Sequence, residues 1–189
     1  MTQQADTATV PTPLWAPSQA QMDASRLAHY QQWLARHYGV PRGEYADLWQ
    51  WSVDNLELFW TSIWEYFDVL AGGSNQPVLG SETMPGAQWF PNATLNYAEN
   101  IFRNATDQRP ALIARNENAE PFEVSWAQLQ HEAGALAASL RKLGIGKGDR
   151  VVSYLPNRPE TVVAFMACAS LGAVWSSCAP DMGVRVVTD

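Results

Sequence analysis

The first candidate for a functional side chain is Asp181, in the segment Ser176-Ser177-Cys178-Ala179-Pro180-Asp181-Met182-Gly183. The run Ala173–Cys178 just before it indicates a strand, so Asp181 is expected in the loop after that strand. Open parallel sheets bind their ligands at the carboxyl ends of their strands. The residues alone leave a second interpretation open, a Pro-Asp turn that only leads into the next helix.

The stretch Gly144-Ile145-Gly146-Lys147-Gly148-Asp149 contains three glycines and in this respect resembles a phosphate-binding loop. A loop of that kind follows a strand and opens a helix, because backbone N–H groups and the helix dipole hold the anion. Here the order is reversed, since the glycines follow an expected helix and precede an expected strand. The stretch is therefore interpreted as a turn.

The remaining residues of catalytic type do not form a pattern. Cys168 and Cys178 lie in apolar surroundings and are interpreted as small buried hydrophobes in a reducing compartment. The histidines at positions 29, 37 and 131 fall on expected helix surfaces without metal-ligand spacing, so solvated roles are expected for them. No catalytic residue and no metal ligand is assigned.

Composition excludes several classes of protein. The net charge of -7 argues against a nucleic-acid partner, which requires a basic face. The apolar fraction of 47% favours a globular core. The first twelve residues do not resemble a signal peptide, and no apolar run reaches the ~20 residues of a membrane span. A cytoplasmic protein without membrane or nucleic-acid partners is expected; the oligomeric state is left open.

The first part of the chain predicts helices rich in tryptophan. Residues 1–13 are polar and predict a disordered leader, and a helix is expected over 18–38. Asp54 and Glu57 indicate a capping box for a second helix. The large apolar side chains of this helix form one stripe, which must pack against another part of the protein. They are Leu56, Phe59, Trp60, Ile63, Trp64 and Phe67. A ligand-stacking role for this stripe is the less favoured interpretation.

The second part of the chain predicts alternating strands and helices. A hairpin is expected from strands at 111–115 and 122–125, followed by a helix over 126–143 that Ser125 and Gln128 would cap. Next come a strand at 150–155, a helix capped by Asn157 and Glu160 that ends at Gly172, and a strand at 173–178. This order indicates a parallel βαβ unit. Since two or three parallel strands do not complete a covered sheet, the sequence predicts a truncated domain.

Several segments together resemble the acetoacetate–CoA ligases, which are adenylate-forming acyl-CoA synthetases. The resemblance extends over residues 13–189. Ala179 and Met182 depart conservatively from the Ser and Phe expected in that family. The segments that carry the resemblance are Pro13-Leu14-Trp15, Leu48–Val53, Phe59–Phe67, Trp89-Phe90-Pro91, Leu95–Asn100, Gly148–Val151, Tyr154–Asn157, Leu171–Val174 and Ser176–Gly183.

The resemblance implies an α/β fold in which a helical extension precedes the first βαβ portion of the adenylate-forming large domain. The expected division is a leader at 1–13, the Trp-rich extension at 14–85, and the incomplete AMP-binding domain at 86–189. In the intact enzyme, ATP and acetoacetate would give an acyl-adenylate, which CoA would then capture, with Mg²⁺ offsetting phosphate charge. The family's ATP-binding loop and catalytic Lys have no counterpart in this sequence.

One ligand contact is carried over from acetate-activating relatives. There the loop after the strand equivalent to 173–178 lies against the CoA nucleotide, which places Ala179, Pro180 and Asp181 on one wall of a CoA site. Those relatives have glycines where Pro180 and Asp181 stand. No cofactor is expected to bind tightly to these 189 residues alone. Two alternatives stay open: a non-catalytic docking module, and part of a ligase for another short acyl acid such as acetate.

Overall fold

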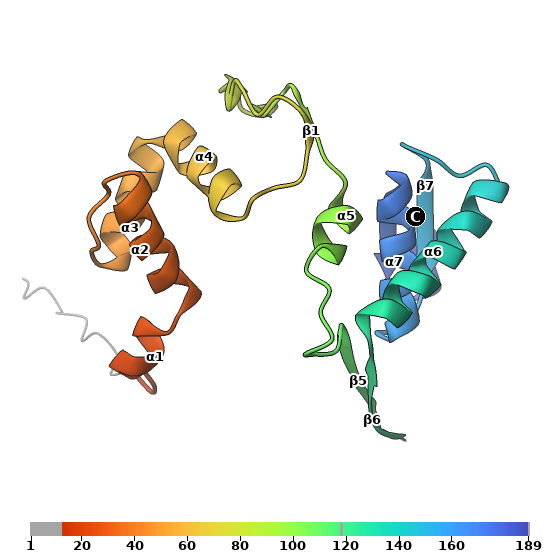
Figure 1. Cartoon of the computed structure of the whole chain (residues 1–189). Coiled ribbons are helices and arrows are strands. Elements are labelled where there is room, and N and C mark those ends of the chain that lie inside the picture. Colours follow the sequence, from red (N-terminus) through yellow and green to blue (C-terminus); the bar gives the residue numbers. More distant parts are fainter. Residues whose placement is uncertain (1–12, 118, 189) are drawn as a thin grey trace, which may run out of the picture. The chain divides into compact units, whose positions relative to one another are not determined.

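The computed structural model describes residues 13–117 and 119–188, and the chain divides into two compact units between Asp68 and Val69 (Figure 1). The first unit is helical, and the second combines helices with short strands, as the α/β prediction requires. The predicted leader, apart from Pro13, lies outside the described residues.

In its described part, from residue 13 on, the first unit has four helices that pack around aromatic side chains. These helices are α1 (Gln19–Asp23), α2 (Arg26–His37), α3 (Tyr45–Asp54) and α4 (Leu56–Tyr66). Tyr30, Leu34 and Leu48 form the buried centre, and side chains of α3 and α4 such as Trp51 and Ile63 pack against it. The packing therefore joins residues far apart in the sequence into one core.

The predicted helix over 18–38 is in fact two helices, because Ser25 interrupts it. The Ser25 hydroxyl accepts a hydrogen bond from the backbone N–H of Ala28 at 3.1 Å and so caps the start of α2. Ser18 caps α1 in the same way, with Gln21 completing a capping box. A serine within a helical pattern can bond the backbone and open a new helix, and it does so here.

The capping box predicted at Asp54 and Glu57 is wrong. Asp54 ends α3, a helix that the sequence analysis did not predict, and Asn55 is the residue between α3 and α4. The Asn55 side chain donates back to the carbonyl oxygen of Trp51 at 3.0 Å, so it closes α3 rather than capping α4. The stripe on α4 is only partly covered within this unit: Phe59 and Ile63 pack on the core, whereas Phe67 is 62% exposed.

Polar contacts fix α2 against α4. The hydroxyl oxygens of Tyr30 and Ser62 lie 2.6 Å apart in the buried centre, and Ser62 donates to the carbonyl oxygen of Phe59 at 2.7 Å. Tyr30 must therefore be the donor to Ser62. Nearer the surface, Tyr38 donates to the carboxylate of Glu65 at 2.8 Å, and burial, together with this bond, raises the pKa of Tyr38 to about 12. The buried bond between Tyr30 and Ser62 in particular fixes how the two helices pack.

The second unit contains four pairs of strands and four helices among its described residues. Two short antiparallel pairs come first, β1 (Gly72–Gly73) with β4 (Ala93–Thr94) and β2 (Leu79–Ser81) with β3 (Gln88–Trp89). They lie in a passage that was predicted to contain only loops. The remaining elements are α5 (Tyr97–Phe102), β5 (Leu112–Asn116), β6 (Ala119–Val124), α6 (Trp126–Lys142), β7 (Arg150–Tyr154), α7 (Pro159–Leu171), β8 (Val174–Cys178) and α8 (Val184–Thr188).

The predicted hairpin and βαβ unit are confirmed. Strands β5 and β6 form an antiparallel pair. Strands β7 and β8, which α7 connects in the sequence, form a parallel pair. Ser125 caps α6, and Gly172 ends α7 in the left-handed conformation with φ of 70°. The predicted cap of α7 is wrong, because Arg158 occupies the N-cap position and makes no side-chain cap bond.

Three helices enclose most of the core of the second unit. Helices α6 and α7 pack against each other, and α5 packs on α7 (Figure 1). Small side chains at the crossing, Ala98 and Ala133, allow close approach around Met166. A second cluster joins Val124, Leu129 and Val163 beneath the β5–β6 hairpin.

Asn96 links the start of α5 to the end of α7. Its side-chain oxygen accepts from the Glu99 N–H at 3.2 Å, while its Nδ2 donates to the carbonyl oxygens of Ala169 and Ser170, both at 3.1 Å. These two carbonyls belong to the last turn of α7, where few helical N–H groups remain as donors, although the N–H of Gly172 also donates to the carbonyl oxygen of Ala169. One side chain thus satisfies groups on two helix ends.

We expect Asn96→Ala to lower the free energy of unfolding of the second unit by about 2 kcal/mol, since a helix cap and two further hydrogen bonds are lost together. Urea denaturation followed by far-UV circular dichroism would measure the change. The control is Asn104→Ala, which removes an exposed side chain that bonds only to carbonyls of its own helix turn. Equal losses in the two variants would contradict the role given to Asn96.

Candidate functional site

The loop predicted to carry the site leaves the carboxyl end of β8, beside the carboxyl end of β7. Because the two strands are parallel and Tyr154 pairs with Cys178, the residues that follow each strand emerge at one edge. Ala179, Pro180 and Asp181 form a turn there, closed by the N–H of Met182 donating to the carbonyl oxygen of Ala179 at 3.1 Å.

Tyr154 fixes this turn to the neighbouring strand. Its hydroxyl oxygen lies 2.8 Å from the carbonyl oxygen of Pro180 and 3.0 Å from that of Met182, so its one proton lies between the two acceptors. Tyr154 is not among the residues predicted for the site. The signal that could have found it is position, since a polar aromatic residue ends the strand next to the predicted site strand.

The chemistry offered by the turn is that of a binding surface. Ala179 and Pro180 present small apolar surfaces, and Asp181 presents a solvent-exposed carboxylate. A carboxylate accepts hydrogen bonds from hydroxyl or amino groups and repels phosphates. The turn can therefore accept hydrogen bonds from hydroxyl or amino groups, and it disfavours an anion beside Asp181.

Removing the hydroxyl of Tyr154 is expected to loosen the turn without unfolding the unit. In Tyr154→Phe, amide hydrogen exchange of residues 179 and 181–183 should accelerate about fivefold to tenfold, which corresponds to the loss of one hydrogen bond of about 1 kcal/mol. Amides within α6 should keep their protection. Uniform acceleration across both regions would show that the hydroxyl stabilises the whole unit rather than the turn.

The glycine-rich stretch at 144–149 is a turn, as predicted. The N–H of Gly146 donates to the carboxylate of Asp149 at 2.8 Å, and the N–H of Gly148 donates to the carbonyl oxygen of Gly172 at 3.0 Å. The first of these bonds closes the turn, and the second links it to the end of α7. The stretch leads into the amino end of β7, away from the edge where Asp181 lies.

The cysteines and histidines do not assemble a reactive group. Cys168 is 1% exposed, and burial raises the pKa of its thiol, so it stays protonated and unreactive at neutral pH. Cys178 is half-buried, and both thiols are free. His29 bonds the hydroxyl of Tyr66 at 2.7 Å. Across the part of the chain that the structure describes, no three His, Cys, Asp or Glu side chains group as a metal site.

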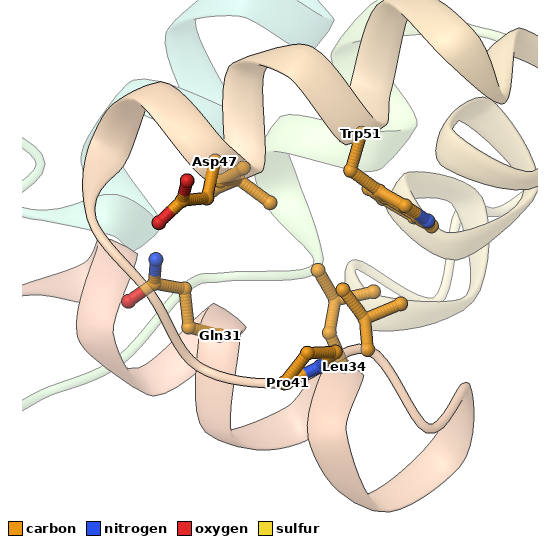
Figure 2. A pocket seen from close by; sticks show the side chains of 7 residues that line it. Gln31, Leu34, Pro41, Asp47 and Trp51 are labelled. Atoms are coloured by element: carbon orange, nitrogen blue, oxygen red, sulfur yellow. The ribbon is translucent and has the colours of Figure 1, made fainter.

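The helical unit contains a separate hollow of about 210 Å³ between α2, the following loop and α3 (Figure 2). Leu34, Leu48 and Trp51 form apolar walls, while the side chains of Gln31 and Asp47 point toward one another on one side. Gln31 donates to the carbonyl oxygen of Gly43, and Asp47 accepts from the N–H of Glu44. Since both polar groups are used to hold the loop, the hollow has the character of a packing defect.

Two family models match adjoining parts of the chain. The model described as "Acetyl-coenzyme A synthetase N-terminus" matches residues 45–101, and the one described as "AMP-binding enzyme" matches residues 101–187. The "Acetoacetyl-coenzyme A synthetase" of Rhizobium meliloti (strain 1021) is 37% identical over 94% of this chain. A solved structure, "Acetoacetyl-CoA Synthetase from Streptomyces lividans", is 50% identical and superposes with a TM-score of 0.87 over 94% of this chain.

The chain is homologous to the N-terminal part of the acetoacetyl-CoA synthetases. It spans about a quarter of the length of the relatives it matches, namely 27% of the Rhizobium protein and 28% of the Streptomyces one. A "Malonamoyl-CoA synthetase vrtB" from Penicillium aethiopicum is also similar, 31% identical over 93% of this chain and 25% of its own length. The resemblance stated from the sequence is thereby confirmed.

Homology also bears on the fold. The match to the Streptomyces acetoacetyl-CoA synthetase includes the helical unit as well as the parallel β7–β8 pair, so the predicted α/β class with a helical beginning is confirmed. None of the helices within the described residues is long and apolar enough to cross a membrane.

Proposed function

We propose that this chain forms the N-terminal part of an acetoacetate–CoA ligase, which joins acetoacetate to CoA through an acyl-adenylate made from ATP. The observation that carries the proposal is 50% identity, with a TM-score of 0.87, to a Streptomyces lividans acetoacetyl-CoA synthetase over 94% of the chain. Residues 14–85 would form the extension and residues 86–189 the beginning of the AMP-binding domain. The two free cysteines fit the cytoplasm, where thiols stay reduced.

Within that function, the turn at Ala179, Pro180 and Asp181 is proposed to form one wall of the CoA site. The apolar surfaces of the first two residues would lie against the adenine ring. The exposed carboxylate of Asp181 would accept a hydrogen bond from a ribose hydroxyl or the adenine amino group. Tyr154 would position the turn through its bonds to two carbonyl oxygens. ATP and Mg²⁺ would bind to parts of the intact enzyme that this sequence does not contain.

Which acyl acid the intact enzyme activates is a separate question from its membership of this ligase family. The same region is 31% identical in a protein named malonamoyl-CoA synthetase, so ligases with differently named acyl substrates share this architecture. A ligase for another short acyl acid is therefore the second candidate, and the choice depends on an acyl pocket formed elsewhere.

A chimaeric enzyme tests the proposal directly. Residues 13–187 of this chain would replace the matching segment of the Streptomyces acetoacetyl-CoA synthetase. The chimaera should support acetoacetate-dependent ATP–pyrophosphate exchange and form acetoacetyl-CoA, whereas the 189-residue chain alone should support neither. A folded chimaera without adenylation would count against the proposal, as would exchange by the chain alone.

In a working chimaera, Asp181→Ala should raise the KM for CoA about threefold to tenfold and leave the exchange reaction unchanged.

A further inference from the structure

A second hollow, of about 230 Å³, lies between the β5–β6 hairpin and the beginning of α7. Leu112, Phe122 and Val162 provide its apolar lining. Leu112 and Val162 also pack on the core cluster of this unit, so this lining is supported from behind. The hollow shares no lining residue with the turn at 179–181.

The polar part of the lining is basic. Arg115, on β5, and Arg158, at the N-cap of α7, are both among its lining residues, as is Asn157. No Asp or Glu is among the lining residues. On a chain whose net charge is -7, two arginines bordering one hollow make a local site that attracts anions.

Both arginines are available to a ligand. Among the residues that the structure describes, Arg115 has no ion-pair partner. Arg158 pairs with Glu160 at 2.9 Å, but the two side chains are 64% and 65% exposed. An ion pair this exposed contributes little, so a bound anion can compete with Glu160 for the guanidinium.

We propose that this hollow binds a small oxyanion that carries a short apolar group. The anionic head would bond to the guanidinium groups of Arg115 and Arg158, which suit carboxylate and phosphate oxygens because they donate two hydrogen bonds at once. The apolar group would lie on Leu112 and Phe122. The hollow is smaller than the ~300 Å³ of sites for drug-sized molecules, which limits the ligand to a short chain or small ring.

Titrations of the ¹⁵N-labelled 189-residue chain with butyrate, acetate and inorganic phosphate would test the site, with chloride at equal ionic strength as reference. Butyrate should shift the backbone amides of residues 112–116 and 157–162 in a saturable way and bind several-fold more tightly than acetate. Phosphate binding more tightly than butyrate would assign the head group as a phosphate, within the same proposal. Equal affinities for butyrate and acetate would overturn the role of the apolar lining.

Matched variants connect the binding to the two arginines. Arg115→Gln and Arg158→Gln should each weaken butyrate binding about fivefold to tenfold, as expected for one charge-assisted contact at a solvated site. Glu160→Gln should strengthen it, because it frees Arg158. Arg42→Gln, which removes the same charge from the helical unit, should have no effect. Shifts that chloride reproduces, or unchanged affinity in both arginine variants, would overturn the proposal.

Discussion

Leu34→Ala is expected to destabilise the helical unit by about 3 kcal/mol, near the middle of the range for a fully buried leucine. Leu34 is 1% exposed and packs between Tyr30 and Leu48 at the centre of the unit. The hollow of about 210 Å³ already borders this side chain. The space left by the truncation would join that hollow, and the neighbouring rings would have to move far to fill it.

Urea denaturation followed by tryptophan fluorescence would measure this loss, because six of the nine tryptophans precede residue 70. The matched control is Leu58→Ala on α4, whose side chain is 51% exposed and which should change stability by less than about 0.5 kcal/mol. A loss below about 1 kcal/mol in Leu34→Ala would show that the four helices are not packed as described.

The elements that were predicted correctly are those whose boundaries depend on local chemistry. Ser125 caps α6 through its own hydroxyl, and Gly172 ends α7 because only glycine readily takes a φ of 70°. The apolar runs between them admit few pairings, so the parallel β7–β8 pair followed from their order. Neighbouring residues are sufficient to predict where elements of this kind begin and end.

Errors occurred where several residues could perform the same local task. Ser25, in the middle of a helical pattern, could have faced solvent in one long helix, but it caps α2 instead. Asp54 and Asn55 could each have capped the next helix, and Asn55 bonds backward to Trp51. The two-residue strands β1 and β4 depend on pairing partners about twenty residues apart in the sequence, and no local pattern marks them.

The candidate site likewise has one part that the sequence predicts and other parts that only the folded structure defines. The position of Asp181 after a strand followed from sequence, since the end of an apolar run can be recognised locally. The bonds from Tyr154 to the carbonyl oxygens of Pro180 and Met182 depend on which strand lies next to which. The basic hollow at Arg115 and Arg158 joins residues more than forty positions apart, so only the folded hairpin and helix define it.

Leu129→Ala should have a similarly large effect on the second unit, again about 3 kcal/mol. Leu129 is 3% exposed on α6 and packs with Val124 of the hairpin and Val163 of α7. It is the side chain through which three elements share one core. Its truncation should therefore increase hydrogen exchange in β6, α6 and α7 together.

The comparison that decides this prediction is Leu143→Ala, at the other end of the same helix, where the side chain is 78% exposed. That variant should leave hydrogen exchange in all three elements unchanged. If Leu129→Ala instead accelerates exchange in α6 alone, the hairpin and α7 are held by other contacts. The chain would then fold as loosely coupled pieces, and the Arg115–Arg158 hollow, formed between the hairpin and α7, would lose its structural support.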